Sequence, residues 1–299
     1  MYSGITQSAC TRYKRKETRL KASEVFGIKK PIIGMVHSLP LPGTPRGKDY
    51  SIEQVYDYGV DEAAILKEAG VDAIMIENAG DIPFVKSEYL GPDTAAFIAV
   101  LGQHIRETTA LPVGINIVAN AVMHSIAAAK ACGGTFVRSN QWANAYIANE
   151  GFVEGASGLA LRYRDLLGAN EIKILADVHV KHGSHAIVQD RPIAEQAADV
   201  EMFDADVLIA TGFRTGHATA PEEVAAIKAG ATLDVLVGSG ISAENCSTLL
   251  SVADGAIVGV SVKNPRRMSG KTDPDKIKRF MDAVYQIREQ SGVTGNETQ

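Results

Sequence analysis

Short hydrophobic runs alternate with longer amphipathic segments along the chain from residue 30 onward. The runs are rich in Val, Ile and Leu and almost continuously apolar, which is typical of parallel strands that are covered on both faces. They predict eight strands, at 31–37, 72–78, 112–118, 134–139, 172–180, 206–212, 234–240 and 255–261.

The segments between these strands carry the signals of helices. The first begins with Ser51 and Gln54 at the spacing of a capping box and ends at Gly70. Others start with Pro or a polar cap and end in Ala-Gly; they cover 91–109, 119–134, 192–205, 220–230, 242–253 and 273–290. This alternation, without a linker, predicts one α/β domain over 23–290, a single (β/α)8 TIM barrel. An open doubly wound sheet is the alternative.

Composition and charge narrow the class of protein. The 299 residues are 45% hydrophobic and 22% charged, as in ordinary globular domains. A net charge of −5 argues against a nucleic-acid binder, and no apolar run approaches the roughly 18 residues of a membrane span. Three widely spaced cysteines, Cys10, Cys132 and Cys246, indicate reduced thiols in a cytoplasmic protein.

The two ends of the chain differ from the barrel segment. Residues 1–22 are rich in Lys and Arg but lack the apolar core of a secretory signal. They are expected to form a flexible basic extension, with an arm that contacts an anionic or membrane-surface partner as the alternative. Residues 291–299 are expected to be a flexible tail.

The barrel predicts where functional groups lie, because βα loops at the carboxyl ends of the strands form the active sites of this fold. Reading those strand ends in order selects six candidate catalytic residues: His37, Glu77, Asn116, Arg138, Asp177 and His179. The opposite ends of the strands are mostly Gly, Pro, Lys or Asp. This bias toward one end is not required by structure alone.

Asp177 and His179 stand two positions apart on a predicted strand, so both side chains are expected to face the barrel mouth. A histidine beside a carboxylate suits proton transfer. The pair could also bind a divalent metal together with Glu77 or His37, or form only a structural hydrogen bond. Acid–base work without a metal is favoured because no H-E-x-x-H spacing is present. Lys181, in the loop beyond, is a candidate anion contact.

Two further strand ends leave alternatives open. Glu77 either forms a salt bridge with Arg138 from a nearby strand or acts as a general base. His37 precedes the Pro- and Gly-rich loop 38–47, which is either a lid over the mouth or a rigid surface turn.

The segment "VGSGISA" (237–243) matches a dinucleotide fingerprint, but the next strand lacks the acidic residue that binds the ribose. In a barrel, the loops after strands seven and eight often form a phosphate site instead. Their backbone N–H groups and one lysine predict this role for Gly238, Ser239, Gly240, Gly259, Val260, Ser261 and Lys263. The alternative is two tight turns that use glycine for its backbone freedom.

Five motifs carry a resemblance to a known family: "PIIGMVHSLPLPGTP", "VDAIMIEN", "GINIVAN", "ADVHVKH" and "VGSGI". Together they resemble the BtpA family, which includes the SgcQ proteins, over about residues 25–287. The resemblance implies a phosphate-binding TIM barrel. The family name comes from photosystem I biogenesis in cyanobacteria, whereas SgcQ-type members of the family accompany carbohydrate genes. The family brings no settled catalytic assignment.

Three functional hypotheses follow. The first is a cytoplasmic enzyme that acts on a small phosphorylated metabolite, a sugar phosphate or a nucleoside-derived phosphate, by isomerase, lyase or aldolase-like chemistry. The second is a non-catalytic biogenesis or stability factor for a membrane protein complex. The third is a metal-dependent hydrolase. No cofactor requirement is evident, a divalent metal stays an open alternative, and a homo-oligomer is expected to suit such a barrel.

Overall fold

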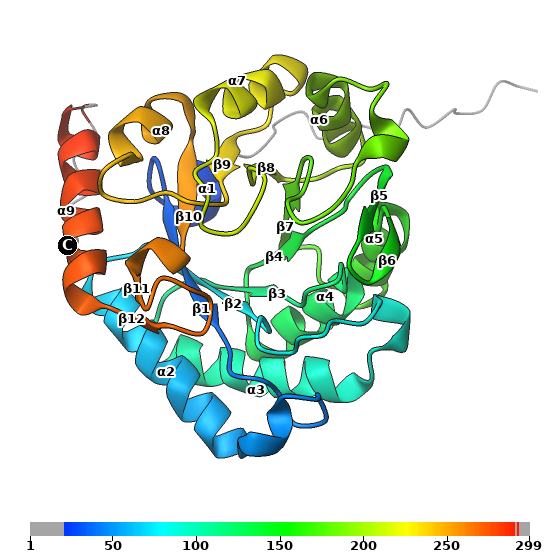
Figure 1. Ribbon diagram of the computed structural model, residues 1–299, viewed down its shortest axis with the longest axis vertical. Helices are drawn as coiled ribbons and strands as arrows, with labels where there is room; N and C mark the ends of the chain where they lie inside the picture. The colour runs from blue at the N-terminus through cyan, green and yellow to red at the C-terminus, as the bar shows by residue number, and fades with distance from the viewer. Residues whose placement is uncertain (1–20, 291, 293–299) are drawn as a thin grey trace, which may run out of the picture.

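The computed structural model describes residues 21–290 and 292. Eight parallel strands close into a barrel in the order β1-β2-β3-β4-β7-β8-β9-β10 (Figure 1). The ring closes where β1 pairs with β10, with Ile33 opposite Ile257. The predicted TIM barrel is therefore confirmed, and the open sheet is excluded. The strands are β1 (Ile32–His37), β2 (Ala73–Glu77), β3 (Val113–Asn116), β4 (Phe136–Ser139), β7 (Lys173–Asp177), β8 (Val207–Ala210), β9 (Val235–Val237) and β10 (Gly255–Val258).

Helices surround the barrel (Figure 1). Ser51 caps the first of them in the predicted box, since its side chain accepts from the Gln54 N–H and Gln54 reaches back to the Ser51 N–H. The helices are α2 (Ile52–Glu68), α3 (Pro92–Thr109), α4 (Val122–Cys132), α5 (Ser157–Leu166), α6 (Ile193–Met202), α7 (Pro221–Gly230), α8 (Cys246–Val252) and α9 (Pro274–Gln290).

Smaller elements decorate the loops. An antiparallel hairpin follows β4 and was not predicted, and neither was α5 behind it. The hairpin strands are β5 (Ala145–Ala148) and β6 (Gly151–Glu154), and a second antiparallel pair is β11 (Lys263–Asn264) with β12 (Lys271–Thr272). Four 3-10 turns are η1 (Gly47–Asp49), η2 (Ser87–Tyr89), η3 (Ala186–Val188) and η4 (Val260–Val262).

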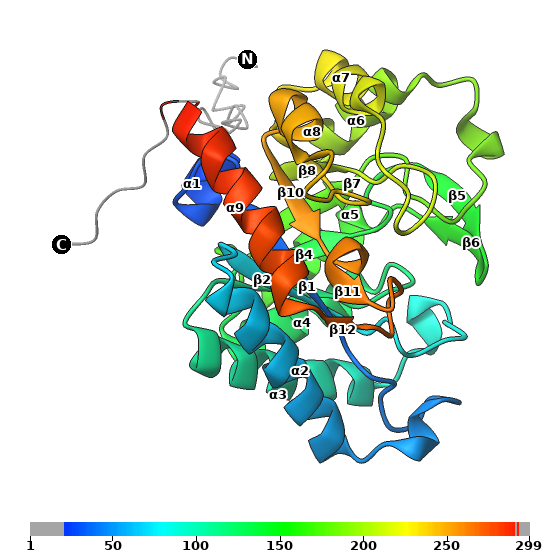
Figure 2. The same cartoon turned by 60° about the vertical axis from the view of Figure 1, so that its left-hand side comes forward.

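The barrel interior is filled at its amino end. Gly114 leaves room for the Phe136 ring, since a Cβ added at Gly114 would lie 2.0 Å from Phe136 Cε2. Helix α1 (Ala22–Phe26) packs beneath, with Phe26 edge-on to Phe136 at a centroid distance of 5.2 Å. Figure 2 shows α1 on the side of the strands opposite the β5–β6 hairpin. A site inside this barrel therefore opens at the carboxyl ends of the strands.

Aspartates at the amino ends of the strands serve the fold. Asp72 accepts a hydrogen bond from the Ile32 N–H at 2.6 Å, and Asp254 accepts one from the Val235 N–H at 2.8 Å. These bonds satisfy the first donors of neighbouring strands. The polar groups at the two ends of the barrel thus have different work.

Parts of the predicted extension and tail lie outside the described residues, namely 1–20, 291 and 293–299. Ala22, which the prediction placed in the extension, is buried in α1 as part of the barrel floor. Within 21–290, no helix has the length and apolar character needed to cross a membrane.

Candidate functional site

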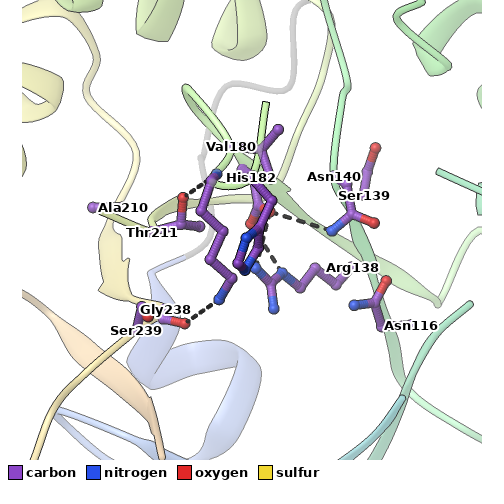
Figure 3. A network of polar contacts seen from close by, with 12 residues as sticks. Asn116, Arg138, Ser139, Asn140, Val180, His182, Ala210, Thr211, Gly238 and Ser239 are labelled. Carbon is purple, nitrogen blue, oxygen red and sulfur yellow. Dashed lines mark hydrogen bonds and ion pairs between the residues drawn. The ribbon is translucent and has the colours of Figure 1, made fainter. Parts of the chain in front are cut away.

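A pocket opens at the carboxyl end of the barrel and collects side chains from strands far apart in sequence. It is lined by four of the predicted chemical groups, His37, Glu77, Arg138 and Lys181. The loops Gly238–Gly240 and Gly259–Ser261 form its other wall. Figure 3 shows Arg138 pointing toward the turn at Gly238. The geometry thus brings three of the predicted catalytic residues, His37, Glu77 and Arg138, together with the two glycine loops.

Glu77 is at the centre of the polar contacts. Strand register places it between His37 and Asn116 in one row across β1, β2 and β3. Asn116 donates to Glu77 Oε2 at 2.6 Å, while His37 Nε2 and Arg138 Nη1 each lie 3.8 Å from a Glu77 oxygen. The side chain is 13% exposed, so the carboxylate is held by neighbours and still reachable from the pocket.

Arg138 is held by a buried carboxylate. Its Nε and Nη2 donate to the two oxygens of Asp177, each at 2.9 Å, and Asn140 donates to Asp177 at 3.3 Å (Figure 3). Burial acts to lower the pKa of Arg138, but the charges of Asp177 and Glu77 outweigh it, and the net shift is upward. The guanidinium is a permanent cation beside the pocket.

His37 is neutral near pH 7. Burial lowers the pKa of His37 well below its ordinary value, and the positive charges of Lys263, Lys181 and Arg138 lower it further. Its buried Nδ1 has no hydrogen-bond partner among the described residues. A neutral imidazole in a pocket accepts protons, so His37 suits a general base or a hydrogen-bond contact to a ligand.

The neutral state of His37 predicts a pH dependence of stability. Because the folded pKa is lower than that of the unfolded chain, near 6.5, the stability contribution is present above pH 6.5 and is lost as the pH falls below it. From pH 7.5 to 5.5 the free energy of unfolding should fall by about 1.4 kcal/mol more in the wild type than in His37→Gln. Urea unfolding at both pH values measures this difference. Equal losses in the two proteins would contradict a neutral, buried His37.

Lys181 enters the same pocket. Burial lowers the pKa of Lys181 to about 8, and Arg138 lowers it as well. Its Nζ lies 3.4 Å from the Gly238 carbonyl oxygen, and its backbone N–H donates to Thr211 Oγ1 at 2.9 Å. The side chain therefore reaches from the loop after β7 to the loop after β9.

The two glycine loops present unused donors. Within the described residues, the N–H groups of Ser239 and Gly240 take part in no hydrogen bond. Gly240 has φ +68°, and a Cβ there would lie 2.2 Å from the His217 carbonyl oxygen. Ser261 Oγ is buried without a partner in the same part of the chain. Free N–H groups and a hydroxyl beside Lys181 form a concave donor surface that suits an anion.

The sequence of the chain matches a known protein family. The BtpA family model covers residues 28–286, most of the chain. The chain belongs to the BtpA family.

This BtpA-family chain matches its relatives over nearly their whole length. An uncharacterized protein from Archaeoglobus fulgidus is 35% identical over 257 residues, covering 86% of this chain and 99% of the relative. The photosystem I biogenesis protein BtpA of Synechocystis is 31% identical over 268 residues, covering 87% and 90%.

Solved structures share the fold of the BtpA family chain at low identity. A thiamine phosphate pyrophosphorylase from Pyrococcus furiosus superposes with a TM-score of 0.51 and 16% identity, covering 86% of this chain and 96% of that one. A phosphoribosyl anthranilate isomerase from Thermus thermophilus has a TM-score of 0.55 and 11% identity, covering 86% and 100%. At such identities the likeness concerns the barrel fold alone.

His179 of the BtpA-family chain does not join Asp177, and the predicted pair is wrong. Strand β7 ends at Asp177, and His179 adopts φ +67°, which turns its side chain away. His179 is exposed, with Nδ1 3.2 Å from Gln196 Oε1 and its ring stacked on His185 at 3.8 Å. Asp177 instead orients Arg138.

Lys263 is also misplaced by the phosphate prediction. Its side chain is fully buried, and its Nζ lies 3.0 Å from Glu62 Oε2 in α2. Lys263 is not among the residues that line the mouth pocket. Asn116 is likewise absent from the lining, and it contributes by holding Glu77.

The prediction missed the loop after β8. Thr215 and Gly216 line the pocket, and Thr215 is held by His182, whose Nε2 lies 2.7 Å from Thr215 Oγ1. The position of this loop at a carboxyl strand end was the signal that could have found it. Among the described residues there is no group of three or more His, Cys, Asp or Glu side chains arranged to hold a metal ion.

Proposed function

We propose that this protein is an enzyme that acts on a small phosphorylated metabolite. The observation that carries the proposal is the single pocket lined by Lys181, His37 and Glu77 together with two glycine loops that offer unused donors. Ser239, Gly240 and Ser261 would bind the phosphate. His37 and Glu77 would move protons in an isomerase, lyase or aldolase-like step.

A second pocket offers space for the organic part of the metabolite. It shares Glu77, Arg138, Lys181 and Thr215 with the first pocket. Its remaining lining mixes apolar side chains with amide, phenol, imidazole and carboxylate groups: Ile82, Phe84, Val118, Ala119, Asn140, Tyr146, Ala148, Asn149, Glu150, Val180, His182 and Met268. A phosphate in the first pocket would therefore extend its organic part past Glu77 and Lys181. A sugar phosphate and a nucleoside-derived phosphate each combine a phosphate group with an organic part of this kind.

Native mass spectrometry of the freshly purified chain tests the proposal. We expect a retained phosphorylated molecule, released on denaturation and identified by its phosphate loss. In Gly240→Ala the added Cβ would displace the loop, since it meets backbone atoms of His217. That folded variant should retain no such molecule. Gly168→Ala, at a glycine with no atom within 4 Å of an added Cβ, is the matched control with positive φ. Retention of the same molecule by all three proteins would overturn the proposal.

The name of one relative favours a second candidate function. The Synechocystis relative is a photosystem I biogenesis protein, which supports a non-catalytic assembly role for a membrane complex. The test is to express this chain and its His37→Gln variant in a Synechocystis strain that lacks the relative. An assembly factor should restore photosystem I in both forms. Restoration by the wild type alone would favour the enzyme.

A further inference from the structure

Lys181 and Lys263 are the two lysines predicted to contact an anion, and the structure gives them different partners. Lys263 Nζ lies 3.0 Å from Glu62, which fixes its charge in an ion pair. Lys181 has no carboxylate within 4.0 Å of Nζ among the described residues, and its one contact is the 3.4 Å approach to the Gly238 carbonyl oxygen. Lys181 is the mouth lysine whose nitrogen is free to react.

The surroundings of Lys181 increase the neutral fraction of its amine, although the charges of Glu77 and Asp177 act in the opposite direction. The permanent cation Arg138 lines the same pocket and is anchored there by Asp177. Burial and this cation hold the pKa of Lys181 at about 8, whereas an ordinary lysine titrates near 10.4. A neutral amine is nucleophilic at physiological pH, which an exposed ammonium is not.

Lys181 also stands at the junction of the two pockets. It lines both the pocket with the glycine loops and the adjoining pocket of mixed apolar and polar lining. If the proposed function holds and a phosphate occupies the loops at Ser239 and Gly240, the first carbons of the metabolite lie at this junction. A carbonyl group near the phosphate would then meet the Lys181 nitrogen.

We propose that Lys181 is a Schiff-base nucleophile and that the substrate is a phosphorylated aldehyde or ketone. The neutral amine attacks the carbonyl carbon, forming a C–N bond while the amine proton passes to the carbonyl oxygen. A proton taken from solvent then releases that oxygen as water and leaves a protonated imine. His37 and Glu77, which line the same pocket, exchange protons at the neighbouring carbon, whose acidity the imine raises. Hydrolysis returns the amine.

Borohydride trapping tests this assignment. The full-length chain is incubated with glyceraldehyde 3-phosphate and sodium borohydride, which reduces an imine to a stable secondary amine. Peptide mass mapping should find the adduct on Lys181. Trapping should be at least about tenfold weaker with unphosphorylated glyceraldehyde, because the charge-assisted contacts to phosphate are missing. Inorganic phosphate should protect Lys181.

Matched variants control the experiment. Lys181→Arg keeps the positive charge but cannot form the imine, so the adduct should disappear while phosphate binding by calorimetry remains. Lys173→Arg, at the amino end of β7 and therefore away from the mouth, should trap like the wild type. Circular dichroism checks the fold of each variant.

The outcomes separate the two proposals. Phosphate binding in the mouth without any adduct on Lys181 would overturn the Schiff-base assignment and leave the proposed function standing. An adduct on Lys181 that forms equally with both aldehydes, without protection by phosphate, would support the nucleophile and overturn the phosphate site.

Discussion

Arg138→Met is expected to lower the free energy of unfolding by about 3–5 kcal/mol, as for other buried ion pairs that lose one partner. The substitution leaves Asp177 charged, with 0% of its side chain exposed and, among the described residues, only the 3.3 Å hydrogen bond from Asn140. It also removes the cation beside Glu77. Urea unfolding followed by circular dichroism measures the loss.

A double variant separates stability from function. In Arg138→Met/Asp177→Leu no charge is stranded, so much of the lost stability should return, because apolar replacements of buried pairs are often neutral or better. The pocket would still lack its permanent cation. A single variant as stable as the wild type would contradict the bidentate pair.

Lys263→Met is the second substitution with a large expected effect. Glu62 accepts hydrogen bonds from Lys263 Nζ, the Thr272 N–H and the Thr272 hydroxyl, at 3.0, 2.9 and 2.8 Å. These bonds join α2 to the β11–β12 pair across about two hundred residues of sequence. Removing the ammonium leaves a buried carboxylate, and the free energy of unfolding should fall by about 3–5 kcal/mol.

An exposed ion pair supplies the control for Lys263. Lys278 and Asp282 form an i,i+4 pair at 3.0 Å on α9, with side chains 70% and 55% exposed. Lys278→Met should cost less than about 1 kcal/mol. Urea midpoints of both variants give the comparison. If both variants lost only a little unfolding free energy, Lys263 would not be held by Glu62 and would again be a candidate phosphate ligand.

Local patterns were sufficient to predict the barrel. Each strand of the ring coincides with an apolar run, and each predicted helix occurs, because both depend on residues close in sequence. The β5–β6 hairpin and α5 were missed. Helix α5 lacks the proline start and glycine end that mark several other helices, since its N-cap is Ala156 and its C-cap is Leu167. Strand β7 was predicted too long, because Val178 and Val180 continue the alternation and are buried under loops after the strand has ended.

The location of the site could be predicted from the sequence, but most of the contacts within it could not. The rule that function gathers at carboxyl strand ends brought His37, Glu77, Arg138 and the glycine loops to one pocket. Which cation meets which carboxylate depends on three-dimensional packing. The Glu62–Lys263 pair is an example, since no sequence motif indicated that Glu62 would be buried in its helix and bind a lysine.

We expect phosphate to bind at the mouth of this barrel between the two glycine loops. The decisive experiment is a crystal structure of the full-length chain grown with inorganic phosphate. A phosphate should lie within hydrogen-bond distance of the Ser239 and Gly240 amides and the Ser261 hydroxyl, with Lys181 beside it. A mouth free of phosphate at a concentration that saturates binding in solution, or an anion bound elsewhere on the chain, would rule out this binding site.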